Sequence, residues 1–272
     1  MTILKILALV LTFNVSVKSW AHESLTTSTH MDVYGKSREL TTKYGSARSV
    51  LVVFDIDNTL LKARQPLGSD QWFEWQSEAI KNHTSEALFG TFDELLAAQA
   101  DFFQLSSMSL TEQNLPQIVS ALKRFGHHIV LLTSRGPTLR NLTERELSKN
   151  GLWFSDSSIM NGVPNDFMEA PFKLPVNFQN GIFMTSGHHK GEALAYLLRK
   201  SGKQFKAVIF ADDHEKHTKR VYETFSPGTS TEIVTFRYSK EDESVAGFKA
   251  GSKSQVNAQA VEVIRTYRKI FK

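Results

Sequence analysis

The chain has 272 residues, a formal charge of +4 and no cysteine. Without cysteine it has no disulfide, thiol nucleophile, iron–sulfur cluster or cysteine-ligated zinc. With 41% hydrophobic and 22% charged residues, its composition is typical of a globular protein, and its length predicts one large domain or one domain with an insertion.

The first 21 residues resemble a bacterial signal peptide. Lys5 is positively charged, residues 6–13 form a short apolar run, and residues 19–21 (Ser-Trp-Ala) match a small-x-small cleavage site. This run is much shorter than the roughly 20 residues of a membrane-spanning helix. We therefore predict export to the periplasm or beyond, with no stable membrane insertion after cleavage. Removing Lys5 and Lys18 lowers the charge from +4 to +2, which does not favour a nucleic-acid partner.

Buried strands and helices alternate along most of the remaining chain. Residues 49–56 are apolar and β-branched, as in strands buried on both faces. Similar segments lie at 128–133, 181–185, 206–212 and, at a predicted sheet edge, 233–238. Helical patterns lie at 31–44, 114–125, 139–150, 190–201, 214–225 and 256–271. This alternation predicts an α/β fold with a three-layer, Rossmann-like parallel sheet covered by helices on both faces.

Residues 60–127 interrupt the alternation, because they contain no convincing strand and are longer than a single crossover helix needs. Helical patterns lie at 69–82 and 92–105. We predict a helical cap at 61–106, inserted after the first of these strands into a core formed by residues 22–60 and 107–272. We expect the aromatic residues of the insertion to form its own small core, although Trp72 is equally placed to face a pocket.

Polar residues follow the predicted strands at the edge where ligands of open parallel sheets bind. The first strand ends in Asp55-Ile-Asp57-Asn-Thr59, the second in Thr133-Ser134-Arg135, and the fourth in Asp212-Asp213, while Lys190 begins the helix after the third. The sequence therefore brings four carboxylates, hydroxyl groups and an amine to one edge of the sheet.

These residue types suit phosphoryl transfer with a magnesium ion. Mg²⁺ prefers oxygen ligands, which Asp55 and Asp212 would supply from adjacent strands. A carboxylate beside a metal ion and a lysine stays ionised, so Asp55 is the candidate nucleophile of an aspartyl-phosphate intermediate. Asp57 is near enough to act as the general acid and base. The candidate phosphate-binding residues are Thr133, Ser134 and Lys190.

The order of these motifs resembles that of the haloacid dehalogenase (HAD) superfamily over residues 50–238. The similar segments are Val-Val-Phe-Asp55-Ile-Asp57-Asn-Thr59-Leu, Val130-Leu-Leu-Thr133-Ser-Arg, Lys190 and Ile209-Phe-Ala-Asp212-Asp213. The resemblance implies that Asp55 is both nucleophile and Mg²⁺ ligand, and that Asp57 binds the metal through its backbone carbonyl. It also implies a metal-ligand role for Asp212, while the role of Asp213 stays open because members of the superfamily differ over the second acid.

Three shorter stretches more narrowly resemble a family of secreted bacterial HAD-like proteins of unknown function: Thr-Ser-Arg-Gly, Lys-Gly-Glu-Ala-Leu and Phe-Ala-Asp-Asp-His-x-x-His. We therefore expect a secreted, Mg²⁺-dependent phosphatase that hydrolyses a small phosphorylated substrate. A phosphotransferase, a phosphoprotein phosphatase, and a secreted domain that binds a host or envelope partner stay open as alternatives. The sequence specifies neither the substrate nor the oligomeric state.

Several other polar residues near the motifs have more than one interpretation. Arg135 can reach a phosphate or brace an aspartate. His214 and His217, three residues apart, can bind a metal in principle, but His214 is better placed to support Asp213. His188 and His189 directly precede Lys190 and are not favoured as metal ligands.

Overall fold

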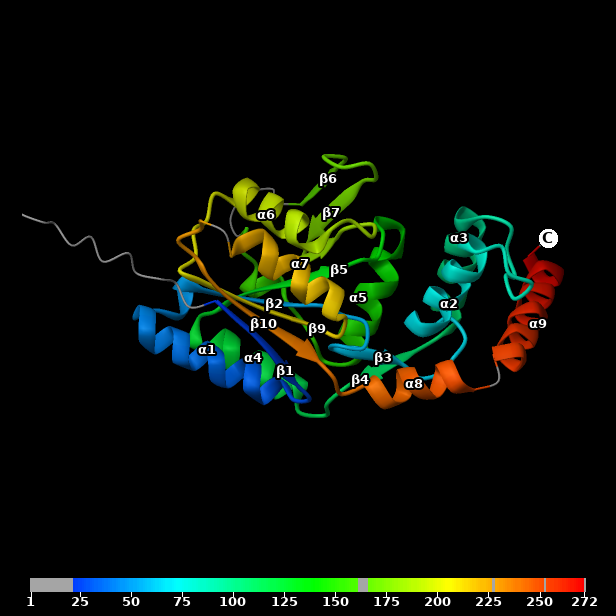
Figure 1. Ribbon diagram of the computed structural model, residues 1–272, viewed down its shortest axis with the longest axis horizontal. Helices are drawn as coiled ribbons and strands as arrows, with labels where there is room; N and C mark the ends of the chain where they lie inside the picture. The colour runs from blue at the N-terminus through cyan, green and yellow to red at the C-terminus, as the bar shows by residue number, and fades with distance from the viewer. Residues whose placement is uncertain (1–21, 161–165, 227, 252, 272) are drawn as a thin grey trace, which may run out of the picture.

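The computed structural model describes residues 22–160, 166–226, 228–251 and 253–271, and its centre is an eight-stranded sheet (Figure 1). Its strand order is β1-β10-β9-β2-β5-β8-β7-β6. The strands are β1 (Glu23–Thr27), β2 (Val50–Phe54), β5 (His128–Thr133), β6 (Phe167–Glu169), β7 (Val176–Gln179), β8 (Ile182–Met184), β9 (Ala207–Asp212) and β10 (Glu232–Tyr238). In this order, neighbouring strands from β1 through β10, β9, β2 and β5 to β8 are parallel. β7 is antiparallel to β8, and β6 is antiparallel to β7.

Helices cover both faces of this sheet, which confirms the predicted α/β fold with a mostly parallel sheet. Alternate residues of β2 point to opposite faces. Val52 and Phe54 pack with α1 (His30–Tyr44), α4 (Leu115–Phe125) and α5 (Arg140–Lys149). Leu51 and Val53 pack on the other side with α6 (Lys190–Ser201) and α7 (Glu215–Phe225). Short 3₁₀ helices lie at Ala47–Ser49, Pro137–Leu139 and Ser155–Ser157.

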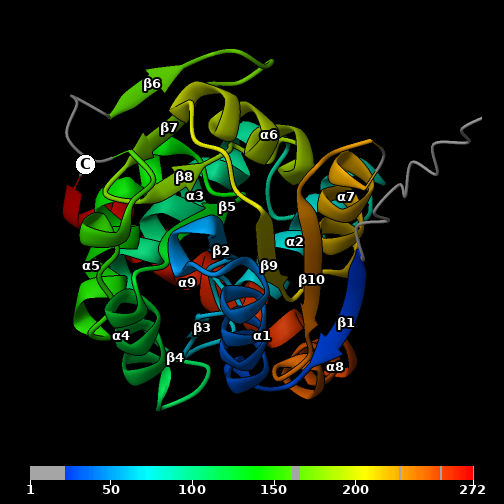
Figure 2. The same cartoon turned by 90° about the vertical axis from the view of Figure 1, so that its left-hand side faces the viewer.

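The two edges of the sheet differ from the prediction. β10 is not an edge strand, because β1 pairs with its outer side, with Glu23 opposite Val234 (Figure 2). The other edge is extended by β7 and β6, which form an antiparallel hairpin. The predicted signal peptide at residues 1–21 lies outside the described residues. Within the described residues, no helix is long and apolar enough to span a membrane.

The predicted insertion contains the two expected helices, α2 (Asp70–Lys81) and α3 (Phe92–Leu105). The expectation that it has no strands is wrong. β3 (Leu61–Ala63) and β4 (Met108–Leu110) form a short antiparallel ladder at its base. Three residues in each strand give too short a pattern to recognise in sequence. Two further helices follow β10, namely α8 (Asp242–Ala250) and α9 (Lys253–Phe271), of which α8 was not predicted.

The cap helices and α9 share one small hydrophobic core, and Figure 1 shows them side by side beyond the sheet. Trp72 is fully buried there, with its ring edge-on to Phe102 and the centroids 5.2 Å apart. Val256 and Ala260 of α9 belong to the same cluster. Trp72 is therefore a core residue. The cap boundary at 61–106 stays a prediction. The contacts show that α9, which lies outside this range, packs with the cap helices.

Glu112 joins the segment before α4 to α1 and β10. It accepts hydrogen bonds from Thr29 Oγ1, from the backbone N–H of His30 at 2.7 Å and from Tyr238 Oη, and it lies 2.6 Å from His30 Nδ1. Burial of the carboxyl group opposes ionisation, but these bonds, led by His30, lower the pKa of Glu112 from 4.5 to about 2. The carboxylate thus links three elements of the fold.

The protein is expected to lose stability in acid through this group. Its pKa is lower in the folded than in the unfolded chain, so its contribution is complete above pH 4.5 and falls as the pH drops towards 2. Between pH 7 and 3.5 this contribution should fall by on the order of 1 kcal/mol. Urea unfolding at both pH values measures it. Glu112→Gln should show a correspondingly smaller pH effect, and an unchanged pH effect would contradict this assignment.

Candidate active site

The carboxyl ends of β2 and β9 bring Asp55 and Asp212 together, as predicted. The backbone N–H of Asp55 donates to the carbonyl of Ala211 at 2.9 Å, so Asp55 continues the ladder between the two strands. Asp212 is the last residue of β9, and both aspartates are buried. Their backbones are therefore fixed by the sheet, which limits how far the carboxylates can move.

The chain turns sharply after Asp55. Asn58 has a positive φ of 53°, which asparagine tolerates better than most residues. Its N–H donates to the carbonyl of Leu61 at 2.7 Å. Thr59 is buried, and its hydroxyl accepts a hydrogen bond from the N–H of Asp213 at 3.0 Å. The Asp-x-Asp-x-Thr motif therefore also joins the turn after β2 to the end of β9.

Lys190 lies between the two buried aspartates. Its Nζ is 2.6 Å from Asp55 Oδ1 and 2.6 Å from Asp212 Oδ2, and the side chain is only 1% exposed. Lys190 is the first residue of α6, and the next residue is Gly191. A Cβ atom on Gly191 would collide with Thr224 of α7. Close packing of these helices therefore fixes the start of α6, where the sequence analysis placed Lys190 as a candidate phosphate-binding residue.

A third carboxylate, that of Asp213, lies beside Asp55 and Asp212. Asp55, Asp212 and Asp213 each offer a carboxylate oxygen within 4.8 Å of the others. Asp213 is 9% exposed, and its Oδ1 has no hydrogen-bond partner in the described part of the chain. When all three carboxylates are ionised, their negative charge exceeds the charge of Lys190, which pairs with Asp55 and Asp212. Because all the donors are oxygens, this group fits a hard divalent cation such as Mg²⁺.

The electrostatics of the group agree with this fit. Burial, together with Asp212 and Asp57, raises the pKa of Asp55 to about 7, although Lys190 acts in the opposite direction. Burial likewise raises the pKa of Asp213. Burial disfavours the charged form of Lys190, but Asp212 and Asp55 raise its pKa, so the ammonium group stays charged. A bound cation would favour full ionisation of the carboxylates.

Thr133 and Ser134 lie at the end of β5, beside this group in the sheet. Thr133 is buried, and its hydroxyl accepts a hydrogen bond from the N–H of Arg135 at 3.2 Å. The Ser134 carbonyl accepts from the N–H of Gly187 at 2.8 Å, which ties this loop to the one before α6. In the described residues, no hydrogen bond joins Thr133 or Ser134 to the carboxylates. Their role as phosphate ligands stays a prediction.

Arg135 braces Asp57. Its Nε donates to Asp57 Oδ2 at 2.8 Å and its Nη2 to Oδ1 at 2.7 Å, which is a bidentate pair. The guanidinium carbon lies 4.2 Å from the ring centroid of Phe103 in α3, and Nη1 donates to Thr143. Of the two interpretations of Arg135, the structure thus has it bound to an aspartate. Through Phe103 this pair also contacts the cap.

Asp57 lines a cavity of about 120 Å³ between the core and the cap. Ser134 and Arg135 line it from the core side, and the cap side is lined by Asp70, Phe73, Leu96, Gln99 and Phe103. Gln99 donates to the carbonyl of Gly68, while its Oε1 has no partner in the described part of the chain. The sequence analysis missed Gln99 and Phe103. Gln99 and Phe103 follow Leu96 by three and seven residues, so the three lie on one face of α3. This spacing is the sequence signal that could have identified them.

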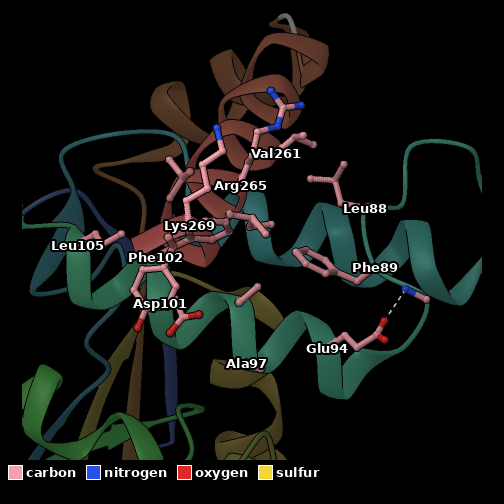
Figure 3. A pocket seen from close by; sticks show the side chains of 15 residues that line it. Leu88, Phe89, Glu94, Ala97, Asp101, Phe102, Leu105, Val261, Arg265 and Lys269 are labelled. Carbon is pink, nitrogen blue, oxygen red and sulfur yellow. Dashed lines mark hydrogen bonds between the residues drawn. The ribbon is translucent and has the colours of Figure 1, made fainter. Parts of the chain in front are cut away.

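A larger hollow of about 960 Å³ lies away from Asp57, between α3 and α9 (Figure 3). Glu94 and Asp101 come from α3, while Arg265 and Lys269 come from α9. Its size alone does not make it a reaction site, because none of the strand-end residues lines it. The smaller cavity is lined by Asp57, Ser134 and Arg135, though not by Asp55, Lys190 or Asp212, and it is therefore the candidate substrate cavity.

The four histidines considered in the sequence analysis have different surroundings in the structure. His214 Nε2 lies 3.8 Å from Asp213 Oδ2 and also faces Asp70 of the cap, and the ring of His217 is 5.5 Å away. A hydrogen bond with Asp70, opposed by burial, raises the pKa of His214 to about 10. His188 contacts the backbone of Leu174, and His189 caps α6. His214 is thus the histidine that adjoins the carboxylate group.

The comparison with known proteins comes to two findings. A family model described as a protein of unknown function (DUF2608) matches residues 30–266. No curated protein matches the chain. Neither finding includes an activity.

Proposed function

We propose that this chain, which belongs to the DUF2608 family of proteins of unknown function, is a HAD-type, Mg²⁺-dependent phosphatase that acts on small phosphomonoesters. The observation that carries the proposal is the position of Lys190 between the buried carboxylates of Asp55 and Asp212, 2.6 Å from each. The motif order that resembles the HAD superfamily supports the same assignment. A purely structural ion pair would have no need of a third buried carboxylate beside it.

Asp55 is the proposed nucleophile. Its carboxylate oxygen would attack phosphorus, and the bond between phosphorus and the alcohol oxygen would break. Asp57 would give its proton to the leaving alkoxide. In the second step Asp57 would take a proton from water, whose oxygen attacks phosphorus. This step releases inorganic phosphate and restores the Asp55 carboxylate.

Arg135 holds Asp57 at the cavity and leaves a position for a proton on either oxygen. The bidentate pair engages each oxygen of Asp57 once. A carboxylate oxygen has two lone pairs, so each oxygen keeps one that can bind a proton. We expect Arg135 to act as a positioning residue, which keeps the acid beside the leaving group.

Mg²⁺ fits Asp55, Asp212 and Asp213, which would hold it together with the Asp57 carbonyl implied by the resemblance. When bound, the ion would offset the negative charge of the phosphoryl oxygens. Lys190 would contribute a fixed positive charge to the same oxygens, and Thr133 and Ser134 would donate hydrogen bonds to them.

The cavity beside Asp57 favours a small leaving group. Its volume is about 120 Å³, and Phe73 and Phe103 of the cap helices line it. A phosphorylated side chain on a folded protein would have to enter past these rings. The cavity therefore favours a small phosphomonoester over the phosphoprotein alternative.

Removing the metal should abolish activity reversibly. We expect the mature protein to hydrolyse para-nitrophenyl phosphate with Mg²⁺, and EDTA to lower the rate by about 100-fold or more, since metal ions supply several kcal/mol of transition-state stabilisation. Restoring Mg²⁺ should restore the rate. Absence of turnover on this substrate and on a panel of small phosphomonoesters would contradict the proposed function.

A further inference from the structure

We propose a second cation site, separate from the Mg²⁺ group, in which Asp70 and Glu74 of the cap and His214 of the core hold a transition-metal ion such as Zn²⁺. Asp70 and Glu74 lie on α2, and His214 lies in the turn between β9 and α7. Each offers a ligand atom, and the three atoms lie within 4.8 Å of one another. The proposal does not depend on phosphatase activity.

The contact between His214 and Asp70 is a long hydrogen bond, and its length also matches the spacing of ligand atoms around a metal ion. His214 Nε2 is 3.4 Å from Asp70 Oδ2 and 3.5 Å from Glu74 Oε1. Good N–H···O hydrogen bonds are about 2.7–3.2 Å long. Ligand atoms about 2.0–2.1 Å from a tetrahedral zinc ion lie about 3.3–3.4 Å from each other. The imidazole thus already has the separation from both carboxylates that a shared ion requires.

The proposed ligands come from helix α2 and from the turn between β9 and α7. Asp70 and Glu74 are one turn apart on α2, so they share a face, where two like charges are unfavourable without a cation between them. The Ser69 side chain caps this first turn by accepting from the Trp72 N–H. On the core side, the His214 N–H donates to Asp212 Oδ1 at 2.8 Å. Little rearrangement is therefore needed to bind an ion.

Asp213, a proposed ligand of the Mg²⁺ group, also adjoins this second cluster. Its Oδ2 faces the same imidazole nitrogen, 3.8 Å away, while its nine-tenths-buried side chain leaves Oδ1 without a partner in the described residues. With Asp70 and Glu74, three carboxylates surround one imidazole.

The donor set selects a different metal from the neighbouring group. One imidazole nitrogen with two carboxylate oxygens suits Zn²⁺ or Mn²⁺, whereas Mg²⁺ prefers oxygen alone. Asp70 also lines the cavity that contains Asp57. An ion here would join α2 to the turn after β9 and so hold the cap against the core at the rim of the proposed substrate cavity.

Calorimetric titration of the tag-free mature protein with ZnCl₂ in excess Mg²⁺ tests this site. We expect one Zn²⁺ per chain, and Co²⁺ in its place should give the visible absorption of a tetrahedral site. The double variant Asp70→Asn, Glu74→Gln should weaken Zn²⁺ binding by about 10-fold or more, because ligand loss costs at least as much as loss of a supporting contact. Glu78→Gln, one turn further along α2 and also exposed, is the matched control and should bind as the wild type does.

Two results would overturn the proposal. One is equal Zn²⁺ binding by the wild type and the double variant. The other is Zn²⁺ binding that Asp212→Asn removes and the double variant keeps, because the ion would then occupy only the Mg²⁺ group. The single variant Glu74→Gln changes a half-exposed side chain and should fold normally, so a loss of affinity there is not a folding defect. Because the readout is bound metal, failure of the phosphatase proposal would leave this result interpretable.

Discussion

Asp55→Asn is expected to abolish phosphatase activity, with a fall in kcat of about 10⁴-fold or more, as for removal of other covalent nucleophiles. The amide has nearly the same shape as the carboxylate but cannot form the acyl phosphate. It also removes one negative charge from the proposed Mg²⁺ group. The measurement is the steady-state rate with para-nitrophenyl phosphate and saturating Mg²⁺.

The stability of Asp55→Asn separates lost chemistry from lost structure. The folded chain raises the pKa of Asp55 above its ordinary value of 3.8, to about 7. A carboxyl group with a raised pKa lowers stability as the pH rises from 3.8 towards 7, because the folded state then binds more protons than the unfolded state. The neutral amide lacks this effect. Without metal at pH 7, the variant should therefore be at least as stable as the wild type.

Asp57→Asn is the matched comparison for the same experiment. Para-nitrophenolate leaves without help from an acid, so this variant should still form the acyl phosphate and then hydrolyse it slowly. Rapid mixing should show a burst of para-nitrophenolate with Asp57→Asn and none with Asp55→Asn. Retention of more than about one hundredth of the rate by Asp55→Asn would reject the nucleophile while sparing the reaction class.

The parts of the fold that could be predicted are those in which burial leaves a local pattern. β2 and β9 are buried on both faces, so nearly every residue in them is apolar. β1, with the sequence Glu-Ser-Leu-Thr-Thr, lies at an edge and alternates in burial, so it has no such run. β6 is a three-residue edge strand. These edge strands depend on partners far away in the sequence.

The residues of the candidate site likewise include some that the sequence could predict and some that it could not. Asp55 and Asp212 could be predicted because a strand end fixes where a side chain lies. The pairing of Arg135 with Asp57 could only be left open, because it depends on how two loops approach each other. Gln99 reaches the cavity through the docking of α3, and α9 joins the cap from more than 150 residues away. No local pattern encodes such contacts.

Lys190→Met is expected to impair both stability and activity. Methionine fills much of the same volume but leaves Asp55 and Asp212 buried without their shared cation. Removing one partner from a buried ion pair costs about 3–5 kcal/mol, so urea unfolding in EDTA should show a loss of this order. Lys200→Met, on the exposed side of the same helix, loses an ion pair with Glu169 and should change stability far less.

The response of Lys190→Met to pH and Mg²⁺ shows whether its charge or its packing matters. Protonation of the carboxylates relieves their repulsion, so the stability difference from the wild type should be smaller at pH 5 than at pH 8. Mg²⁺ should restore part of the lost stability, because the ion can neutralise the same carboxylates. Activity should stay low even with Mg²⁺, since the fixed charge on the phosphoryl group is absent. A stability loss independent of both pH and Mg²⁺ would mean that Lys190 only fills space between α6 and the sheet.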